Sequence, residues 1–260
     1  MNHIIRIVLV FFLIISNANA DVLEIKVDQH SISLPYWPAG KAHYGGVMIV
    51  RGGADVAQAP MLTHFAEQLS HNGWSVVLLN CTNDNTTPWV QQIPETIRAL
   101  REAKNKRIVL VHYGEQLNQS LEYFRKPQSK MINGFVLLSA YDEQSSLDKT
   151  PSLRFPLFDI AGQFDYDTVL NQMKQRGKEF KGYKYRAAEI PGAHHDYQYN
   201  QKMLLAFIHG WMIKLPESET QPPPILVSFI ESVYSSASLI AELDESNWSG
   251  FIDDPVEPVQ

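Results

Sequence analysis

Short, largely apolar segments alternate along this chain with segments whose apolar residues recur at helical spacing. The apolar runs are residues 45–50, 74–79, 107–111, 134–138 and 156–160. Such a run, without polar alternation, is typical of a strand that is buried on both faces, as the strands of parallel sheets are. Consecutive parallel strands need a crossover, usually a helix, and the crossover is right-handed in nearly all proteins. The alternation therefore predicts an α/β fold: a doubly wound, mostly parallel sheet with helices on both faces.

The segments between these runs predict the helices. Helical spacing places them at residues 61–71, 88–101, 115–124, 166–180 and 202–215, and one further strand is expected at 183–190. Pro60 stands at the first helical position of one helix, and Pro94 lies inside another, where it predicts a kink. Upstream, residues 22–35 alternate between apolar and polar, with Asp28 and Gln29 between the two halves. That pattern predicts an N-terminal β-hairpin.

The first twenty residues have the pattern of a cleavable signal peptide. Arg6 precedes an apolar run over residues 7–15, and Ala18 and Ala20 form the small-residue pattern that signal peptidase cuts. The run is shorter than the roughly 20 residues that span a bilayer, which argues against a membrane anchor. We expect cleavage near Ala20, a periplasmic or secreted protein, and no transmembrane segment in the mature chain. The single cysteine, Cys81, excludes an intramolecular disulfide.

Charge and composition divide the chain into three expected parts. Residues 1–20 are the signal peptide, and residues 21–215 the α/β domain. Residues 216–260 are expected to form a Pro-rich linker, a short amphipathic helix and an acidic tail, because no Lys or Arg follows Lys214. The helix is expected either to fold back onto the domain or to dock on a partner or a membrane. With a formal net charge of −6 and no basic face, the chain is not expected to bind nucleic acid.

Three segments follow predicted strands and share a recognisable pattern. Residues 51–55 read Arg-Gly-Gly-Ala-Asp, residues 162–165 read Gly-Gln-Phe-Asp, and residues 191–195 read Pro-Gly-Ala-His-His. In this order the chain resembles the α/β-hydrolase superfamily over residues 40–215. The first segment resembles the glycine-rich loop of esterases, whose backbone donates to an oxyanion. The resemblance thus implies that Gly52 and Gly53 are oxyanion-loop candidates.

The other two segments resemble those that carry the acid and base of this superfamily. The resemblance assigns the acid to Asp165 and the base to His195, with the carboxylate fixing the imidazole tautomer. Asp167 is a competing acid. The alternative interpretation is structural: Asp165 caps the following helix, and His194 and His195 are surface loop residues.

The nucleophile position of the same superfamily is filled by a residue without a side chain. The nucleophile elbow, Gly-x-Ser-x-Gly, aligns with residues 112–116, which read His-Tyr-Gly-Glu-Gln and place Gly114 at the nucleophile. Glycine adopts strained backbone angles at little cost, so the turn can persist, but it cannot attack a substrate. The bulky His112 and Gln116 predict a looser elbow. A shifted register would bring Tyr113 or Glu115 to the position, and the backbone N–H of Glu115 is a further oxyanion donor candidate. Other nucleophile candidates lie off the elbow: Ser120, Ser139 and Cys81.

A narrower resemblance covers nearly all of residues 22–215. A signal peptide, an N-terminal hairpin, Gly73-Trp74 before the second buried strand and the Pro156–Ile160 strand are similar to a poorly characterised family of exported bacterial α/β-hydrolase-like proteins. Members of that family often lack a serine elbow, and no agreed activity is attached to it. The short stretch after Ser139 predicts no large cap domain.

Two functions remain open from the sequence. The favoured hypothesis is a pseudoenzyme: a hydrolase-fold module that binds a small ligand or an envelope protein. The alternative is an esterase-like hydrolase in which Asp165 and His195 activate a water, or serve a non-serine nucleophile, with the amides of Gly53 and Glu115 stabilising the oxyanion.

No cofactor is expected, because no glycine-rich nucleotide motif follows any strand. No metal site is expected either, because the run at residues 194–196 lacks spaced partners. The oligomeric state stays open.

Overall fold

The computed structural model describes residues 20–40, 42–53, 59–79, 87–126, 132–143, 155–180 and 184–218. These belong to the unit that ends at Ser218. The expected signal peptide up to residue 19, Cys81, and the expected helix and acidic tail after Ser218 lie outside the described residues. Within the described ranges, no helix is both long and apolar enough to cross a membrane.

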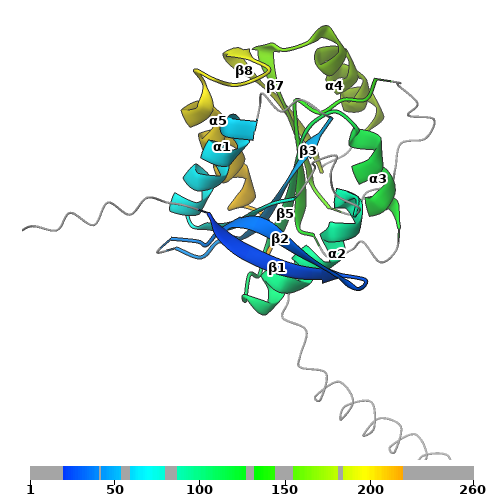
Figure 1. The fold of residues 1–260 in the computed structure, drawn as a ribbon. Coiled ribbons are helices and arrows are strands. Elements are labelled where there is room, and N and C mark those ends of the chain that lie inside the picture. The colour runs from blue at the N-terminus through cyan, green and yellow to red at the C-terminus, as the bar shows by residue number, and fades with distance from the viewer. Residues whose placement is uncertain are drawn as a thin grey trace, which may run out of the picture. The chain divides into compact units, whose positions relative to one another are not determined.

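One eight-stranded sheet forms the centre of the domain (Figure 1). Its strand order is β1-β2-β4-β3-β5-β6-β7-β8. The strands, in chain order, are β1 (Asp21–Val27), β2 (His30–Trp37), β3 (Gly45–Gly52), β4 (Trp74–Leu78), β5 (Ile108–Gly114), β6 (Gly134–Leu138), β7 (Leu157–Phe164) and β8 (Tyr185–His194). All neighbours from β4 to β8 pair in parallel, and the pairs β1–β2 and β2–β4 are antiparallel. The predicted doubly wound, mostly parallel sheet is confirmed.

The expected N-terminal hairpin forms the antiparallel edge of this sheet. β1 and β2 pair along their whole length, and the chain reverses at Asp28, whose φ of 53° is left-handed. β2 then joins the sheet by pairing with β4 at Tyr36 and Trp37. The hairpin therefore extends the parallel core by two strands.

Helices cover both faces of the sheet (Figure 1). They are α1 (Ala59–His71), α2 (Trp89–Glu102), α3 (Leu117–Arg125), α4 (Asp167–Glu179) and α5 (Gln201–Met212). On one face, α1 and α5 bury Leu62, Phe65 and Ile208 against the sheet. On the other face, α2 and α3 bury Ile97 and Leu121. Burial of these apolar faces on a sheet that is itself apolar on both sides is the main source of stability.

Three strands run further than the sequence indicates. β5 continues to Gly114, β7 to Phe164 and β8 to His194, so the prediction that they end at residues 111, 160 and 190 is wrong. The apolar pattern stops at those residues, but the backbone pairing does not: Gly52 still pairs with Gly114, and Phe164 with His194. The glycine and histidine motifs therefore lie on rigid strand ends, not in free loops.

The connections out of β3 and β5 create a gap at one edge of the sheet. β3 lies between β4 and β5, so the chain leaves β3 toward one side of the sheet and later continues from β5 toward the other. In open α/β sheets, ligands bind at the carboxyl ends of strands at such a switch point. The carboxyl ends of β3 and β5 are Gly52 and Gly114.

Candidate functional site

Gly52 and Gly114 face one another in register at this edge. Gly52 must be glycine, because a Cβ there would come within 1.5 Å of the carbonyl oxygen of Glu115. The carboxyl end of β3 thus lies directly against the turn that follows β5.

Gly114 has a different reason to be glycine. Its φ is +82°, a value that L side chains rarely adopt. Among the described residues, a Cβ at this position would meet one atom within 4 Å, the carbonyl oxygen of Gly52 at 3.3 Å. The backbone is strained, but there is room for a side chain.

A buried histidine, His112, holds the turn after Gly114 by a hydrogen bond. Burial lowers the pKa of His112 to about 4, although its hydrogen bond to Glu115 opposes the shift. The imidazole is therefore neutral, and its Nε2–H donates to the carbonyl oxygen of Glu115 at 2.6 Å. Nδ1 then accepts from the Ser120 hydroxyl at 2.8 Å. His112, whose bulk predicts a looser elbow, instead bonds the turn through Nε2 and α3 through Nδ1, while Gln116 takes a left-handed φ of 62°.

The structure brings Asp165 and His195 together across 30 residues of sequence. His195 Nδ1 lies 2.6 Å from Asp165 Oδ1, and both residues are buried. The N–H groups of Gly162 and Tyr166 also donate to this carboxylate. Burial alone raises the pKa of Asp165, but the hydrogen bonds from His195 and Ser139 outweigh it and hold the pKa below its ordinary value. Asp165 is thus an ionised carboxylate that orients the imidazole.

The structural alternatives for these two residues do not fit the geometry. α4 begins after Tyr166, and its N-cap has no side-chain hydrogen bond, so Asp165 does not cap it. Asp167 is exposed at the start of α4, and His195 is buried whereas His194 is exposed.

Ser139 and Tyr197 form a hydrogen-bonded pair next to the Asp165 carboxylate. The Ser139 hydroxyl donates to Asp165 Oδ2 in a short hydrogen bond, and it lies 2.7 Å from the Tyr197 hydroxyl. Ser139 and Tyr197 both have left-handed backbones, with φ of 45° and 51°. The sequence gives no local signal for Tyr197, because a tyrosine in a turn carries no motif. Ser139, considered above as a nucleophile, is instead bonded to Asp165.

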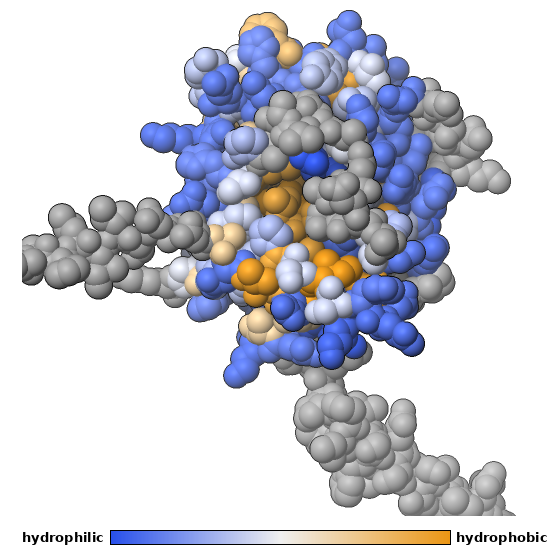
Figure 2. All heavy atoms as spheres, viewed as in Figure 1, coloured by the Kyte–Doolittle hydropathy of each residue, from blue (hydrophilic) through white to orange (hydrophobic). Residues whose placement is uncertain are grey.

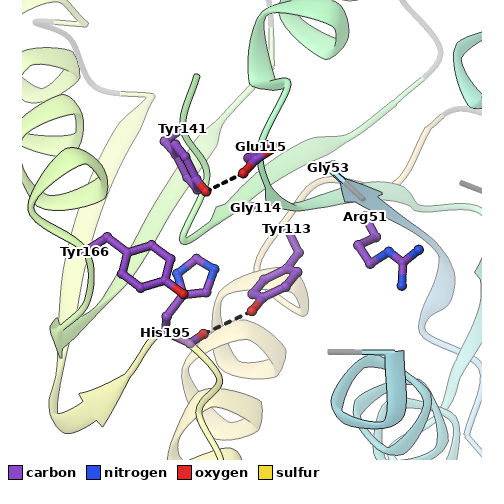
Figure 3. A pocket seen from close by; sticks show the side chains of 9 residues that line it. Arg51, Gly53, Tyr113, Gly114, Glu115, Tyr141, Tyr166 and His195 are labelled. Carbon is purple, nitrogen blue, oxygen red and sulfur yellow. Dashed lines mark hydrogen bonds between the residues drawn. The ribbon is translucent and has the colours of Figure 1, made fainter. Parts of the chain in front are cut away.

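A cavity of about 120 Å³ opens where these elements meet (Figure 3). Its lining residues are Arg51, Gly52, Gly53, Tyr113, Gly114, Glu115, Tyr141, Tyr166 and His195. The cavity therefore gathers the two oxyanion-loop glycines, the elbow and His195, with Asp165 behind the imidazole. The three tyrosines lie far apart in sequence, and only Tyr113 was a candidate from the sequence, as a shifted-register alternative at the elbow.

The tyrosines contact the candidate residues directly. The Tyr166 ring stacks on His195 with centroids 4.2 Å apart, and Tyr166 is 51% exposed, so it forms an outer wall. Tyr113 donates through its hydroxyl to the carbonyl oxygen of His195 at 3.2 Å. Tyr141 donates through its hydroxyl to Glu115 Oε1 at 2.8 Å.

The Glu115 carboxylate lies beside the glycine-rich loop. A Cβ at Gly53 would come within 2.7 Å of Glu115 Oε2. The negative charge of Glu115 therefore lies next to the Gly53 backbone, which is the backbone that would face an oxyanion. This arrangement opposes the build-up of a second negative charge there.

Of the remaining nucleophile candidates, Ser120 lies outside the cavity lining, whereas Tyr113 and Glu115 are part of it. Ser120 is buried under α3 against His112. Tyr113 lines the cavity, but burial, followed by the neighbouring Tyr197 and Asp165, raises its pKa far above the ordinary value and keeps the phenol protonated.

Solved structures share this fold. The chain is similar to a dienelactone hydrolase from Anabaena variabilis, with a TM-score of 0.62, 13% identity, and coverage of 75% of this chain and 97% of that one. It is also similar to the esterase Est1E from Butyrivibrio proteoclasticus, with a TM-score of 0.57, 13% identity, and coverage of 74% and 98%. A lidless α/β serine hydrolase from Xanthomonas campestris matches with a TM-score of 0.56, 12% identity, and coverage of 77% and 97%. No protein-family model and no curated protein matches the sequence.

At these identities the comparisons establish the fold alone. The chain has the α/β-hydrolase fold, which is the fold that its sequence resemblance implies. In the described part of the domain, the residue at the elbow position of this fold, at the end of β5, is Gly114.

Proposed function

We propose that this chain is a hydrolase-fold protein without serine-hydrolase activity, and that it binds a small ligand in the cavity at Gly114. The supporting observation is the geometry of that residue. The strained turn, the buried Asp165–His195 pair and a cavity beside them are all present, while the position from which a nucleophile would project has no side chain. Without a nucleophile, an oxyanion hole and binding groups alone give only about 10³–10⁴-fold over water.

We further propose that the protein acts outside the cytoplasm. The basic start, short apolar run and Ala-x-Ala pattern support removal of residues 1–20 and a periplasmic or secreted location. Membership of the exported hydrolase-like family described above is part of this proposal. The acidic residues beyond Lys214 would favour binding to an envelope protein that has a basic surface.

The alternative is a hydrolase that activates water directly. It is favoured by one observation: His195 is oriented by Asp165 and lines the cavity. The Glu115 carboxylate beside Gly53 weighs against it, because an oxyanion there would face that charge.

Ester hydrolysis by the purified protein and by His195→Ala distinguishes the two. A panel of short- and medium-chain p-nitrophenyl esters samples the reactions of the fold. We expect both proteins to show the same background rate. Turnover that the wild type shows and the variant loses would support the water-activating hydrolase and contradict our proposal.

A further inference from the structure

Aromatic rings enclose the cavity on several sides. The Tyr141 ring is nearly perpendicular to Tyr166, at 86° with centroids 6.3 Å apart, and to His195, at 74° and 6.2 Å. The Tyr113 ring lies 5.2 Å from His195 on the elbow side. Figure 3 shows these rings grouped around one space beside the end of β5. Rings set at angles to one another present both faces and edges to a bound group, and the faces of tyrosine rings are electron-rich.

One carboxylate completes this wall. Glu115 accepts a hydrogen bond from Tyr141, and it has no ion-pair partner among the residues that the structure describes. Arg51 also lines the cavity, but Figure 3 shows its guanidinium beyond Tyr113 and directed away from Glu115. The lining therefore carries one negative and one positive side chain, and Glu115 is the one that bonds a cavity tyrosine.

The phenols themselves stay neutral. Burial raises the pKa of Tyr141 well above its ordinary value, and the hydrogen bond to Glu115 and its charge raise it further. Burial likewise raises the pKa of Tyr113. The cavity thus offers tyrosine faces and hydroxyl groups, with the Glu115 carboxylate bonded to Tyr141 and the Arg51 guanidinium elsewhere in the lining.

We propose that this cavity binds a small organic ammonium group carried by a small molecule. An ammonium placed over the tyrosine faces gains cation–π attraction, and the Glu115 carboxylate supplies its counter-charge. The volume of about 120 Å³ suits a compact head group, such as a methylated ammonium. The Glu115 carboxylate, which bonds Tyr141, would repel an anionic group placed against that ring. This inference rests on the proposed binding function and names the chemical class of its ligand.

The direct test is a titration of the purified protein with tetramethylammonium chloride, followed by NMR signals of the tyrosine rings. Methylammonium chloride, uncharged tert-butanol and sodium acetate are titrated in parallel. We expect saturable binding of at least one ammonium probe, and binding of tert-butanol and of acetate at least about tenfold weaker. The tenfold figure corresponds to about 1.4 kcal/mol, within the range of a desolvated cation–π contact.

Two substitutions locate the effect. Glu115→Gln keeps an acceptor for the Tyr141 hydroxyl and removes the charge, and should weaken ammonium binding about tenfold. Its matched control is Glu122→Gln, an exposed carboxylate on α3, which should leave binding unchanged. Tyr166→Leu removes the half-exposed aromatic wall and should also weaken binding, whereas Tyr199→Leu, at a residue that is 87% exposed, should not.

Three results would overturn the inference: no saturable ammonium binding, equal affinity for tert-butanol, or an affinity that Glu115→Gln leaves unchanged. Tighter binding of acetate than of ammonium would reverse the predicted charge of the ligand. Each of these outcomes is separate from failure of the proposed function. That failure appears only in the ester assay, as turnover that depends on His195.

Discussion

Gly52 and Gly114 are paired in adjacent strands, yet each is glycine for its own reason. At Gly52 the constraint is space, because the Glu115 carbonyl occupies the position that a Cβ would take. At Gly114 the constraint is conformation, since φ is +82° while the neighbouring space is nearly free. A serine at position 114 would therefore keep the turn at the cost of strain, of about 1–3 kcal/mol.

Alanine substitutions at the two glycines test this difference. Gly52→Ala should lower the free energy of unfolding by more than about 3 kcal/mol, because the turn after β5 must move. Gly114→Ala should cost about 1–2 kcal/mol, the usual penalty of a left-handed backbone. Urea unfolding followed by circular dichroism measures both. Equal costs would show that the close approach of β3 to the turn is not as described.

Within single elements, the turn between β5 and α3 depends on one buried imidazole. Neutral His112 donates to the Glu115 carbonyl and accepts from Ser120, so β5, the turn and α3 are joined by side-chain hydrogen bonds. Its pKa in the folded protein, about 4, lies below the ordinary value of 6.5. Between these two values the unfolded chain binds more protons than the folded one, so stability falls as pH falls.

This linkage gives a pH-dependent prediction for His112. The wild type should lose about 3 kcal/mol of unfolding free energy through this residue as pH falls from about 6.5 to about 4. The variant His112→Gln should be less stable at pH 7, but its stability should lack this part of the pH dependence. Urea unfolding at several pH values measures the difference between the two slopes. Parallel curves for the two proteins would mean that His112 titrates normally.

Sequence patterns found the elements better than their ends. β8 was expected without an apolar run, and the apolar runs located the five strands β3 to β7, because burial on both faces leaves a strong local signal. They missed the last residues of β5, β7 and β8, where backbone pairing continues through residues without that signal. Predicting where a strand stops would require knowing its neighbours.

The residues of the candidate site also differ in whether a local sequence pattern could predict them. Asp165, His195 and Gly114 carry short motifs with glycine at fixed positions, so they could be proposed from local sequence. Tyr141 and Tyr166 could not, because they are single aromatic residues that meet only through the order of β5, β6 and β7 in the sheet.

For the whole molecule, the order of strands explains why the site lies where it does. The carboxyl ends of β3 and β5 form the switch point, and the segments after β6, β7 and β8 bring Ser139, Asp165 and His195 to the same edge. Figure 2 shows apolar surface in the hollow on the viewed face and over the region of the N-terminal hairpin, with polar residues around both.

Export is a prediction about the complete chain. When the full sequence is expressed in a bacterium with a periplasm, we expect the protein outside the cytoplasm, with Asp21 as its first residue. Mass spectrometry of the periplasmic and medium fractions measures this. Replacing Ala18 and Ala20 by Arg should block the cleavage, since signal peptidase requires small residues there. An uncleaved wild-type protein in the cytoplasm would contradict the proposed location.

The central claim is that the Asp165–His195 pair stands beside an elbow position that has no nucleophile, and Gly114→Ser tests it most directly. The measurement is p-nitrophenyl ester turnover by the wild type, by Gly114→Ser and by the double variant Gly114→Ser/His195→Ala, after each is shown to be folded by circular dichroism. Our account predicts background rates for the wild type and the double variant, and turnover at least about tenfold higher for Gly114→Ser, because the new hydroxyl would share the cavity with His195. Turnover by the wild type that depends on His195, or a folded Gly114→Ser protein without any gain, would contradict the account.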